Sequence, residues 1–330
     1  ALAGFLQRAH ACHPKAAIVL SLEGHGAGYL PEIDRTQLTV GNVTAGGKIT
    51  WSISDEGSPI LPTGSPILPT GSPILPTGSP ILPVNHMPLS SWGTGDALRR
   101  AQKCGVPKVA VLHFNNCFNM SAELLHTVAP HAEYAAGYMN YNFFTAGEAY
   151  PRVFGNLRAA GSATRAQLAR WFAETNQFGL ELKGNHPTIG GMVRLSDMKP
   201  LAAHIDRLAS VLVAAMQGAT PADRPGVVDA IQAAIVQAQQ YDTLPDYHLD
   251  VPDQLTDIRA FAAALQKQAF AAPDIHPAAA ALEAAMANIR VYGSADNPYP
   301  RMSEFWDFKN PPLAMNILLP DPTRIGLRDW

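Results

Sequence analysis

The chain has 330 residues, of which 47% are hydrophobic, and it carries 24 Lys and Arg against 27 Asp and Glu. That apolar content is ample for a packed core, so we expect a globular protein with one large domain or a core and a helical extension. The net charge of −3 gives no reason to expect a nucleic acid or an anionic membrane as a partner. No apolar run is long enough to span a bilayer. These features favour a soluble protein that acts on a peptide or a small molecule.

The start of the chain and its cysteines say little about the compartment. The first ten residues lack the charged start and apolar centre of a signal peptide, which is compatible with a secreted protein or with one processed from a longer precursor. Three cysteines, Cys12, Cys104 and Cys117, are too few and odd in number for a disulfide framework. We therefore expect at least one free thiol.

Apolar runs in the first half predict a series of buried strands. Residues 15–22 (KAAIVLSL) and 108–114 (KVAVLHF) have the length and composition of parallel strands, and residues 133–139 (EYAAGYM) predict a third. Helices are expected over 96–104 and 120–128, between the strands. This alternation predicts an α/β fold with a parallel sheet flanked by helices.

Residues 57–83 consist of the unit GSPILPT in three full copies and a fourth that ends at Pro83. Two prolines in every seven residues exclude a helix or a central strand, so an extended loop is expected. Two interpretations stay open. The repeat is either an expansion in a tolerant surface loop, which we favour, or a recognition segment that uses its Ile-Leu pairs.

The second half is dominated by Ala-rich amphipathic stretches that predict helices, over residues 164–176, 198–217, 224–240, 256–270 and 277–292. Residues 313–319 (LAMNILL) predict one more strand. We therefore expect an α/β core over residues 1–160, with the repeat inserted at 57–83. Residues 161–330 are expected to form a helical region that packs on the core and returns a final strand.

Two candidate catalytic residues follow the first two predicted strands. His25 lies in a Gly-His-Gly segment and Cys117 follows Asn115-Asn116, and residues beyond the carboxyl ends of parallel strands open into one crevice. A thiolate beside an imidazole can act as a nucleophile, and the imidazole can protonate the leaving amine. The backbone amides of Gly26 and Cys117 could bind the oxyanion. Without further information, a lone Cys is more often an inert packing residue.

The residues around both candidates resemble those of a known family. Residues 20–29 (LSLEGHGAGY) are similar to the clostripain family's strand ending in Asp-His-Gly-x-Gly-Trp/Tyr. Residues 109–120 (VAVLHFNNCFNM), followed by Glu123, resemble its strand ending in Phe-Asp-Ala-Cys-Leu-Met. Weaker similarities follow at 134–150, 195–208 and 313–320. The resemblance implies a caspase-like fold with a mostly parallel sheet flanked by helices and a helix-rich C-terminal half.

The resemblance also implies an activity. It identifies His25 as the catalytic histidine and Cys117 as the nucleophile of a cysteine endopeptidase, with Gly26 beside the oxyanion and a peptide or protein as the substrate. It further implies an inactive precursor that is cut in the long loop between these residues. No cofactor is required, although calcium is associated with some family members. The acidic residues between 242 and 253 match no EF-hand loop, and a solvated loop is the default.

Two departures from the family pattern concern the substrate pocket. Gly24 replaces the acid expected before the histidine, with Glu23 one position earlier, and Asn115 replaces the acid that helps to bind a basic side chain. We assign Asn115 and Glu23 to the pocket and leave the preference for Arg or Lys open, because asparagine could hydrogen-bond another polar side chain.

The alternative is an inactive caspase-like scaffold that serves as a binding or structural module. The loss of both expected acids favours this hypothesis, whereas the presence of His25, Gly26 and Cys117 together favours the peptidase. The family's first core strand, expected upstream of the histidine strand, is also not found in the sequence.

Overall fold

The structure is a computed structural model that describes residues 2–23, 91–139, 142, 149–182, 190–241, 255–287, 289–292 and 314–319. His25, Gly26 and the GSPILPT repeat lie outside the described residues. Their predicted roles therefore stay predictions.

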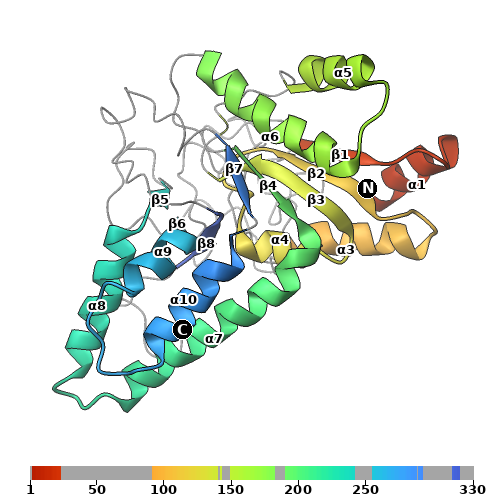
Figure 1. The fold of residues 1–330 in the computed structure, drawn as a ribbon. Coiled ribbons are helices and arrows are strands. Elements are labelled where there is room, and N and C mark those ends of the chain that lie inside the picture. Colours follow the sequence, from red (N-terminus) through yellow and green to blue (C-terminus); the bar gives the residue numbers. More distant parts are fainter. Residues whose placement is uncertain are drawn as a thin grey trace, which may run out of the picture.

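A five-stranded sheet forms the centre of the molecule (Figure 1). Its strand order is β1 (Val19–Glu23), β2 (Val109–Asn115), β3 (Ala132–Tyr138), β4 (Gly190–Arg194) and β7 (Arg290–Tyr292). The first three strands run parallel, as predicted, and β4 and β7 join antiparallel at one edge. The carboxyl ends of β1, β2 and β3 therefore lie at the same edge of the sheet.

Helices cover both faces of this sheet. The described α-helices are α1 (Leu2–Cys12), α3 (Ser91–Lys103), α4 (Ala122–Val128), α5 (Ala149–Ala160), α6 (Arg165–Leu182), α7 (Met198–Gly218), α8 (Arg224–Gln237), α9 (Ile258–Leu265) and α10 (Ile275–Ala285). Figure 1 shows α5 and α6 on one face and α3 and α4 on the other. The helices α7 to α10 gather beside a second, smaller sheet. The predicted α/β class with a helix-rich C-terminal half is thus confirmed.

Strand β2, which lies between β1 and β3, is buried along its whole length because it contributes to a core on each face. Val111 packs with Phe172 of α6 on one side. Leu112 and Phe114 belong to the core on the other side, which includes Leu125 of α4. This alternation places His113 and Asn115, which follow Val111 at intervals of two, on the face covered by α5 and α6, where His113 stacks on Phe172.

The second sheet contains three antiparallel strands in the order β5 (Gln240–Tyr241), β6 (Leu255–Asp257) and β8 (Asn316–Leu318). The final strand predicted over 313–319 is therefore present as β8, and it lies in this smaller sheet. An isolated bridge between Ser121 and Asn316 connects β8 to the start of α4. The C-terminal strand thus reaches the region just after Cys117.

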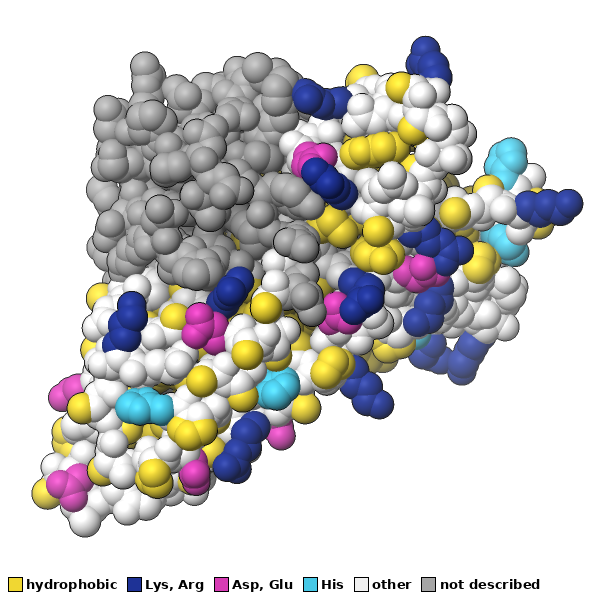
Figure 2. Space-filling view, viewed as in Figure 1, with side chains coloured by type: hydrophobic (Ala, Val, Ile, Leu, Met, Phe, Trp, Pro, Cys, Tyr) yellow, Lys and Arg dark blue, Asp and Glu magenta, His cyan; other side chains and the backbone are white. Residues whose placement is uncertain are grey.

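Strands from both sides of residue 160 share the large sheet, since β1 to β3 precede this residue and β4 and β7 follow it. The division into residues 1–160 and 161–330 stays a prediction. None of the described helices is long and apolar enough to cross a membrane. On the face seen in Figure 2, cationic and anionic side chains are interspersed over the described residues.

Candidate active site

Three of the predicted site residues meet at the carboxyl ends of β1 and β2. Glu23, the last residue of β1, pairs in register with Asn115, the last residue of β2. Cys117 follows two residues later and is partly exposed. The sequence continues from Glu23 to His25 and Gly26 within three positions, but neither of these belongs to the described residues.

The sulfur of Cys117 is contacted by Asn142, a residue that sequence reasoning missed. The backbone N–H of Asn142 donates to Sγ, and the thiol lies within reach of Asn142 Oδ1, each at 3.4 Å. The Asn142 side chain is buried and donates through Nδ2 to the backbone oxygen of Asn115, at 2.9 Å. Asn142 follows β3, the third parallel strand, so the rule that led to His25 and Cys117 could also have indicated this segment.

Phe118, directly after Cys117, has an unusual backbone conformation. Its φ angle is 58°, and it is the only described residue other than glycine with positive φ. A bulky residue in the left-handed region costs on the order of 1–3 kcal/mol and persists only where its surroundings hold it. Its ring is buried in the core, at 5% exposure. The turn that carries the thiol is therefore strained and held by packing.

A chain of polar side chains runs across the sheet face beneath α5 and α6. His113 Nε2 lies 3.1 Å from Asn176 Oδ1, and His113 Nδ1 lies 2.8 Å from the hydroxyl of Ser21. The hydroxyl of Tyr150 is 2.7 Å from the same Ser21 oxygen, and it donates to the carboxylate of Glu23. The chain therefore connects the buried centre of the sheet with the carboxyl end of β1.

Burial controls the protonation of the side chains in this hydrogen-bonded series. His113 is completely buried, and the loss of solvation lowers its pKa to about 4, against the opposing effects of the Asn176 bond and the charge of Glu23. The imidazole is therefore neutral at pH 7. In the observed orientation of Asn176, the single ring N–H of His113 is on Nε2 and donates to Asn176 Oδ1. His113 Nδ1 then accepts a hydrogen bond from the hydroxyl of Ser21.

Tyr150 is also a proton donor at neutral pH. Burial raises the pKa of the Tyr150 hydroxyl, and its hydrogen bond to Glu23 raises it further. The nearby Asn115 amide has a smaller effect that lowers this pKa, although it forms no hydrogen bond of ordinary geometry with the Tyr150 hydroxyl. Tyr150 thus keeps its proton and holds the Glu23 carboxylate.

Asn115 combines deep burial with unused hydrogen-bonding capacity. Its side chain is 1% exposed, and neither Nδ2 nor Oδ1 forms a hydrogen bond to a described residue. A buried amide without partners costs about 1–3 kcal/mol, so such a group is rare unless a ligand or water completes it. Asn115 lies beside Glu23, which is exposed. A ligand bound at the Asn115 amide would therefore also reach the Glu23 carboxylate. Together Asn115 and Glu23 form a polar end to the two strands.

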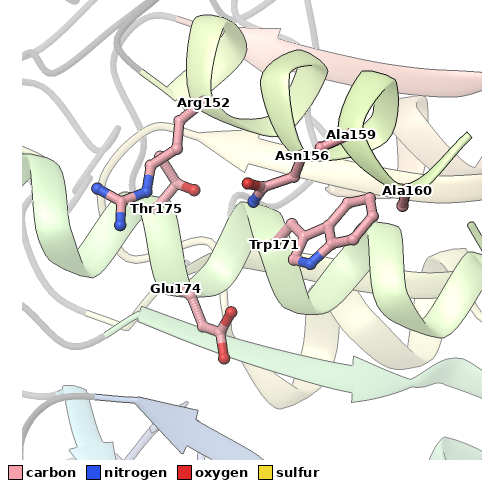
Figure 3. A pocket seen from close by; sticks show the side chains of 7 residues that line it. All are labelled: Arg152, Asn156, Ala159, Ala160, Trp171, Glu174 and Thr175. Carbon is pink, nitrogen blue, oxygen red and sulfur yellow. The ribbon is translucent and has the colours of Figure 1, made fainter.

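A cavity of about 450 Å³ lies elsewhere, between α5 and α6. Figure 3 shows the Trp171 indole and the Asn156 amide facing each other between these helices, with Glu174 directed away from Arg152. Glu174 forms an ion pair with Arg170, at 2.6 Å. None of the residues that line this cavity is a predicted site residue or a member of the polar chain that ends at Glu23.

Metal ligands do not gather in the part of the chain that the structure describes. No three His, Cys, Asp or Glu side chains among these residues form a group that could hold a metal ion. The acidic stretch between 242 and 253 lies outside them.

Known proteins resemble this chain in structure but not in sequence. No protein-family model matches the sequence, and no curated protein matches it. A secreted C11 cysteine protease from Bacteroides thetaiotaomicron, solved with an irreversible peptide inhibitor, aligns with a TM-score of 0.54 and 14% identity, over 99% of this chain and 73% of its own. An inactive zymogen C11 protease from Parabacteroides distasonis aligns with a TM-score of 0.51 and 12% identity, over 100% and 71%.

The chain thus has the caspase-like α/β fold of a class of cysteine proteases. Within that class, the fold is that of the C11 proteases, the clostripain family, and the resemblance carried by the segments around His25 and Cys117 is confirmed at this level. Identities of 14% and 12% establish the fold alone, so the roles of individual residues need their own argument.

Proposed function

We propose that the protein is a cysteine endopeptidase with Cys117 as the nucleophile and His25 as the general acid and base. The observation that carries this proposal is the place of Cys117. A partly exposed thiol follows the central parallel strand of a C11-protease fold, and the neighbouring parallel strand β1 leads into the Gly-His-Gly segment. Such a fold needs neither a thiol nor an imidazole at these positions for its packing.

In the proposed reaction, the Cys117 thiolate attacks the carbonyl carbon of the scissile peptide bond. A C–S bond forms, and the carbonyl electron pair moves to the oxygen, where the amides of Gly26 and Cys117 stabilise the oxyanion. The His25 imidazolium gives its proton to the leaving amine as the C–N bond breaks, which leaves a thioester. His25 then removes a proton from a water molecule that attacks the thioester, and the carboxylic product and the thiolate separate.

Asn142 is suited to both states of the nucleophile. Its side-chain oxygen is positioned to accept the S–H of the resting thiol, and its backbone N–H donates to the sulfur. Donation to sulfur favours the thiolate that attacks the substrate. We therefore assign Asn142 the role of a positioning residue beside Cys117.

Asn115 and Glu23 are proposed to form the substrate pocket. The Asn115 amide offers a donor and an acceptor without partners among the described residues, and the Glu23 carboxylate, oriented by Tyr150, supplies a negative charge on the adjacent strand. This pair would bind a polar side chain on the amino side of the scissile bond. A basic side chain would use the carboxylate of Glu23, and an uncharged one the amide of Asn115.

Activation by proteolytic processing and secretion are further parts of the proposal. One structural neighbour is described as an inactive zymogen and another as secreted. A cut between His25 and Cys117 would fall in a long connection, and because the repeat contains no Lys or Arg, a cut after a basic residue would fall outside it, for example at Lys48.

The test is mass-spectrometric mapping of cleavage sites in a diverse peptide library, under reducing conditions, with and without calcium. The wild type is compared with Cys117→Ala, and Cys104→Ala is the matched control because Cys104 is an exposed thiol away from the site. Cleavage by the wild type and Cys104→Ala alone would support the proposal, and the residue before each cut would show whether Glu23 or Asn115 dominates.

The inactive scaffold remains the second candidate because Asn115 stands where the family has an acid. Protein that is first cut in the loop between His25 and Cys117 is tested beside the intact chain, so that an unprocessed precursor is recognised. If neither form cleaves any peptide while it is folded and reduced, the peptidase proposal is wrong and the scaffold is favoured.

A further inference from the structure

One buried residue of β8 contacts both turns that surround the sulfur of Cys117. Asn316 is completely buried, and its side-chain Nδ2 donates to two backbone oxygens, those of Phe118 and Met139, each at 2.8 Å. These acceptors are 198 and 177 residues away in the sequence. A single primary amide therefore joins two turns that belong to neighbouring strands of the other sheet.

The first turn carries the thiol. Phe118 follows Cys117 directly and has the strained φ of 58°. Asn316 holds this turn in two ways, since its side chain binds the Phe118 oxygen and its backbone N–H donates to the oxygen of Met120, at 3.1 Å. Strained conformations persist where several contacts determine them together. Asn316 supplies two of those contacts.

The second turn carries the partner of the thiol. Met139 is the first residue after β3, and Asn142 follows three positions later. The backbone N–H and the side-chain oxygen of Asn142 are the groups within 3.4 Å of the Cys117 sulfur. Because Asn316 binds the Met139 oxygen as well as the Phe118 oxygen, it sets the spacing between the two turns.

Asn316 is itself held firmly. It pairs in register with Asp257 of β6, and Asp257 accepts a hydrogen bond from the backbone N–H of Ala314, at 2.8 Å. The same carboxylate caps the start of α9 through the N–H groups of Arg259 and Ala260. The two hydrogen bonds of the Asn316 side chain therefore come from a paired strand and not from a surface loop.

We propose that Asn316 is a positioning residue for Cys117. It holds the strained turn of Phe118 and the Asn142 turn at the separation that keeps the Asn142 N–H on the sulfur. Both acceptors are carbonyl oxygens, so the site needs two N–H donors on one short side chain, which only an asparagine amide supplies at this length. The catalytic consequence rests on the proposed peptidase function, whereas the effect on the thiol does not.

The test measures the alkylation rate of Cys117 by iodoacetamide, followed by peptide mass mapping at pH 7 and pH 9. Asn316→Leu removes both donors at similar volume, and we expect alkylation at pH 7 to slow about tenfold because the sulfur loses the aligned Asn142 N–H that favours the thiolate. The difference should shrink at pH 9, where the thiol ionises without that help. Asn316→Ser keeps one O–H donor and should slow the reaction about threefold.

Gln240→Leu is the matched control. Gln240 is a buried amide of the same small sheet whose side chain donates to the Ile235 oxygen, at 3.2 Å, and not to the oxygen of Phe118 or Met139. Its loss should lower thermal stability without changing the alkylation of Cys117.

Two results would overturn the proposal. One is an unchanged alkylation rate in folded Asn316→Leu, and the other is a slowing that Gln240→Leu reproduces or that is equal at both pH values. If Asn316→Leu does not fold, the same criteria apply to Asn316→Ser. In the peptidase assay, Asn316→Ser should lower kcat with little change in KM. A wild type that cleaves no peptide would contradict the proposed function alone, since the alkylation rates still decide the role of Asn316.

Discussion

The large sheet buries a histidine completely and the small sheet buries an aspartate completely, and the two groups are used in opposite ways. In the large sheet, His113 is bonded to Ser21 and Asn176, and burial lowers its pKa to about 4. In the small sheet, burial raises the pKa of Asp257 to about 6, although backbone N–H groups and the Tyr241 hydroxyl donate to it. Desolvation is the largest cause in both cases.

The difference between them lies in what each group does for the fold. His113 is a neutral link in a chain of side chains that ends at Glu23. Asp257 is a shared acceptor that fixes the start of α9 and the backbone of Ala314, two residues before Asn316. The same physical cause therefore gives one sheet a buried base that resists protonation and the other a buried acid that resists ionisation.

The largest effect is expected at Asp257. Asp257→Ala should lower the free energy of unfolding by about 4 kcal/mol, because a helix cap is lost and buried N–H donors are left without an acceptor. Urea denaturation measures this change. Asp274→Ala is the control, since Asp274 precedes α10 and is exposed without a side-chain capping bond, and it should change stability by less than about 0.5 kcal/mol. Equal losses in both variants would contradict the role of Asp257.

The two buried groups should also give opposite responses to pH. Unfolded His113 binds a proton below its ordinary pKa of 6.5, whereas the folded protein does so only near 4. Its contribution is thus present above pH 6.5 and is lost as the pH falls to about 4. Folded Asp257 keeps a proton up to about pH 6, whereas the unfolded chain releases it near 3.8. Its contribution is therefore full below 3.8 and is lost as the pH rises to about 6.

Each contribution amounts to about 3 kcal/mol at its full value, and in the wild type their opposite dependences on pH offset each other between about pH 4 and 6. Asp257→Asn should leave the His113 slope, so that stability falls as the pH is lowered from 6.5 to 4. His113→Gln should leave the Asp257 slope, so that stability falls as the pH is raised from 3.8 to 6. Urea unfolding at several pH values measures both slopes relative to the wild type, and slopes of the same sign would contradict the assignment.

The smallest effect is expected at Tyr150. Tyr150→Phe removes the hydroxyl that joins Ser21 to Glu23, and it should lower the free energy of unfolding by about 1 kcal/mol, the typical net value of one hydrogen bond. Tyr134→Phe on β3 is the control, because that hydroxyl forms no hydrogen bond to a described residue. A similar loss in both variants, measured by urea denaturation, would show that the Tyr150 bonds contribute nothing.

The strands that precede His25 and Cys117 could be predicted from the sequence, but β4 and β7, which complete the large sheet, could not. The apolar runs before His25 and Cys117 correspond to β1 and β2. β2 needs apolar residues on both faces because it is buried throughout, whereas β1 lies at an edge of the described sheet and buries only Leu20. β4 was not predicted, and the prediction of a helix over 277–292 was wrong at β7, because α10 ends at Ala285 and residues 290–292 are a strand. The segments Gly190–Arg194 and Arg290–Tyr292 are short and have little local pattern. Pairing with the existing sheet, and not local preference, makes them strands.

The residues of the candidate site also fall into two groups, those that could be predicted from the sequence and those that could not. Cys117, Asn115 and Glu23 were found because they lie within a motif. Asn142 and Asn316 were not, because an isolated asparagine in a sequence carries no sign of the backbone groups that it will meet. Tyr150 lies at the end of the segment 134–150, whose similarity to the family is weak, and its link to Ser21 and Glu23 appears only when α5 is packed on the sheet.

The contact between Asn316 and Phe118 also constrains when the thiol site can form during protein synthesis. The bonded residues are 198 positions apart. At about 5–20 residues per second, the ribosome needs on the order of 10–40 seconds to add the intervening chain. Until Asn316 has left the exit tunnel, a nascent chain that already contains Cys117 lacks the amide that joins the two turns. The arrangement around this sulfur can therefore be completed only after β8 has been synthesised.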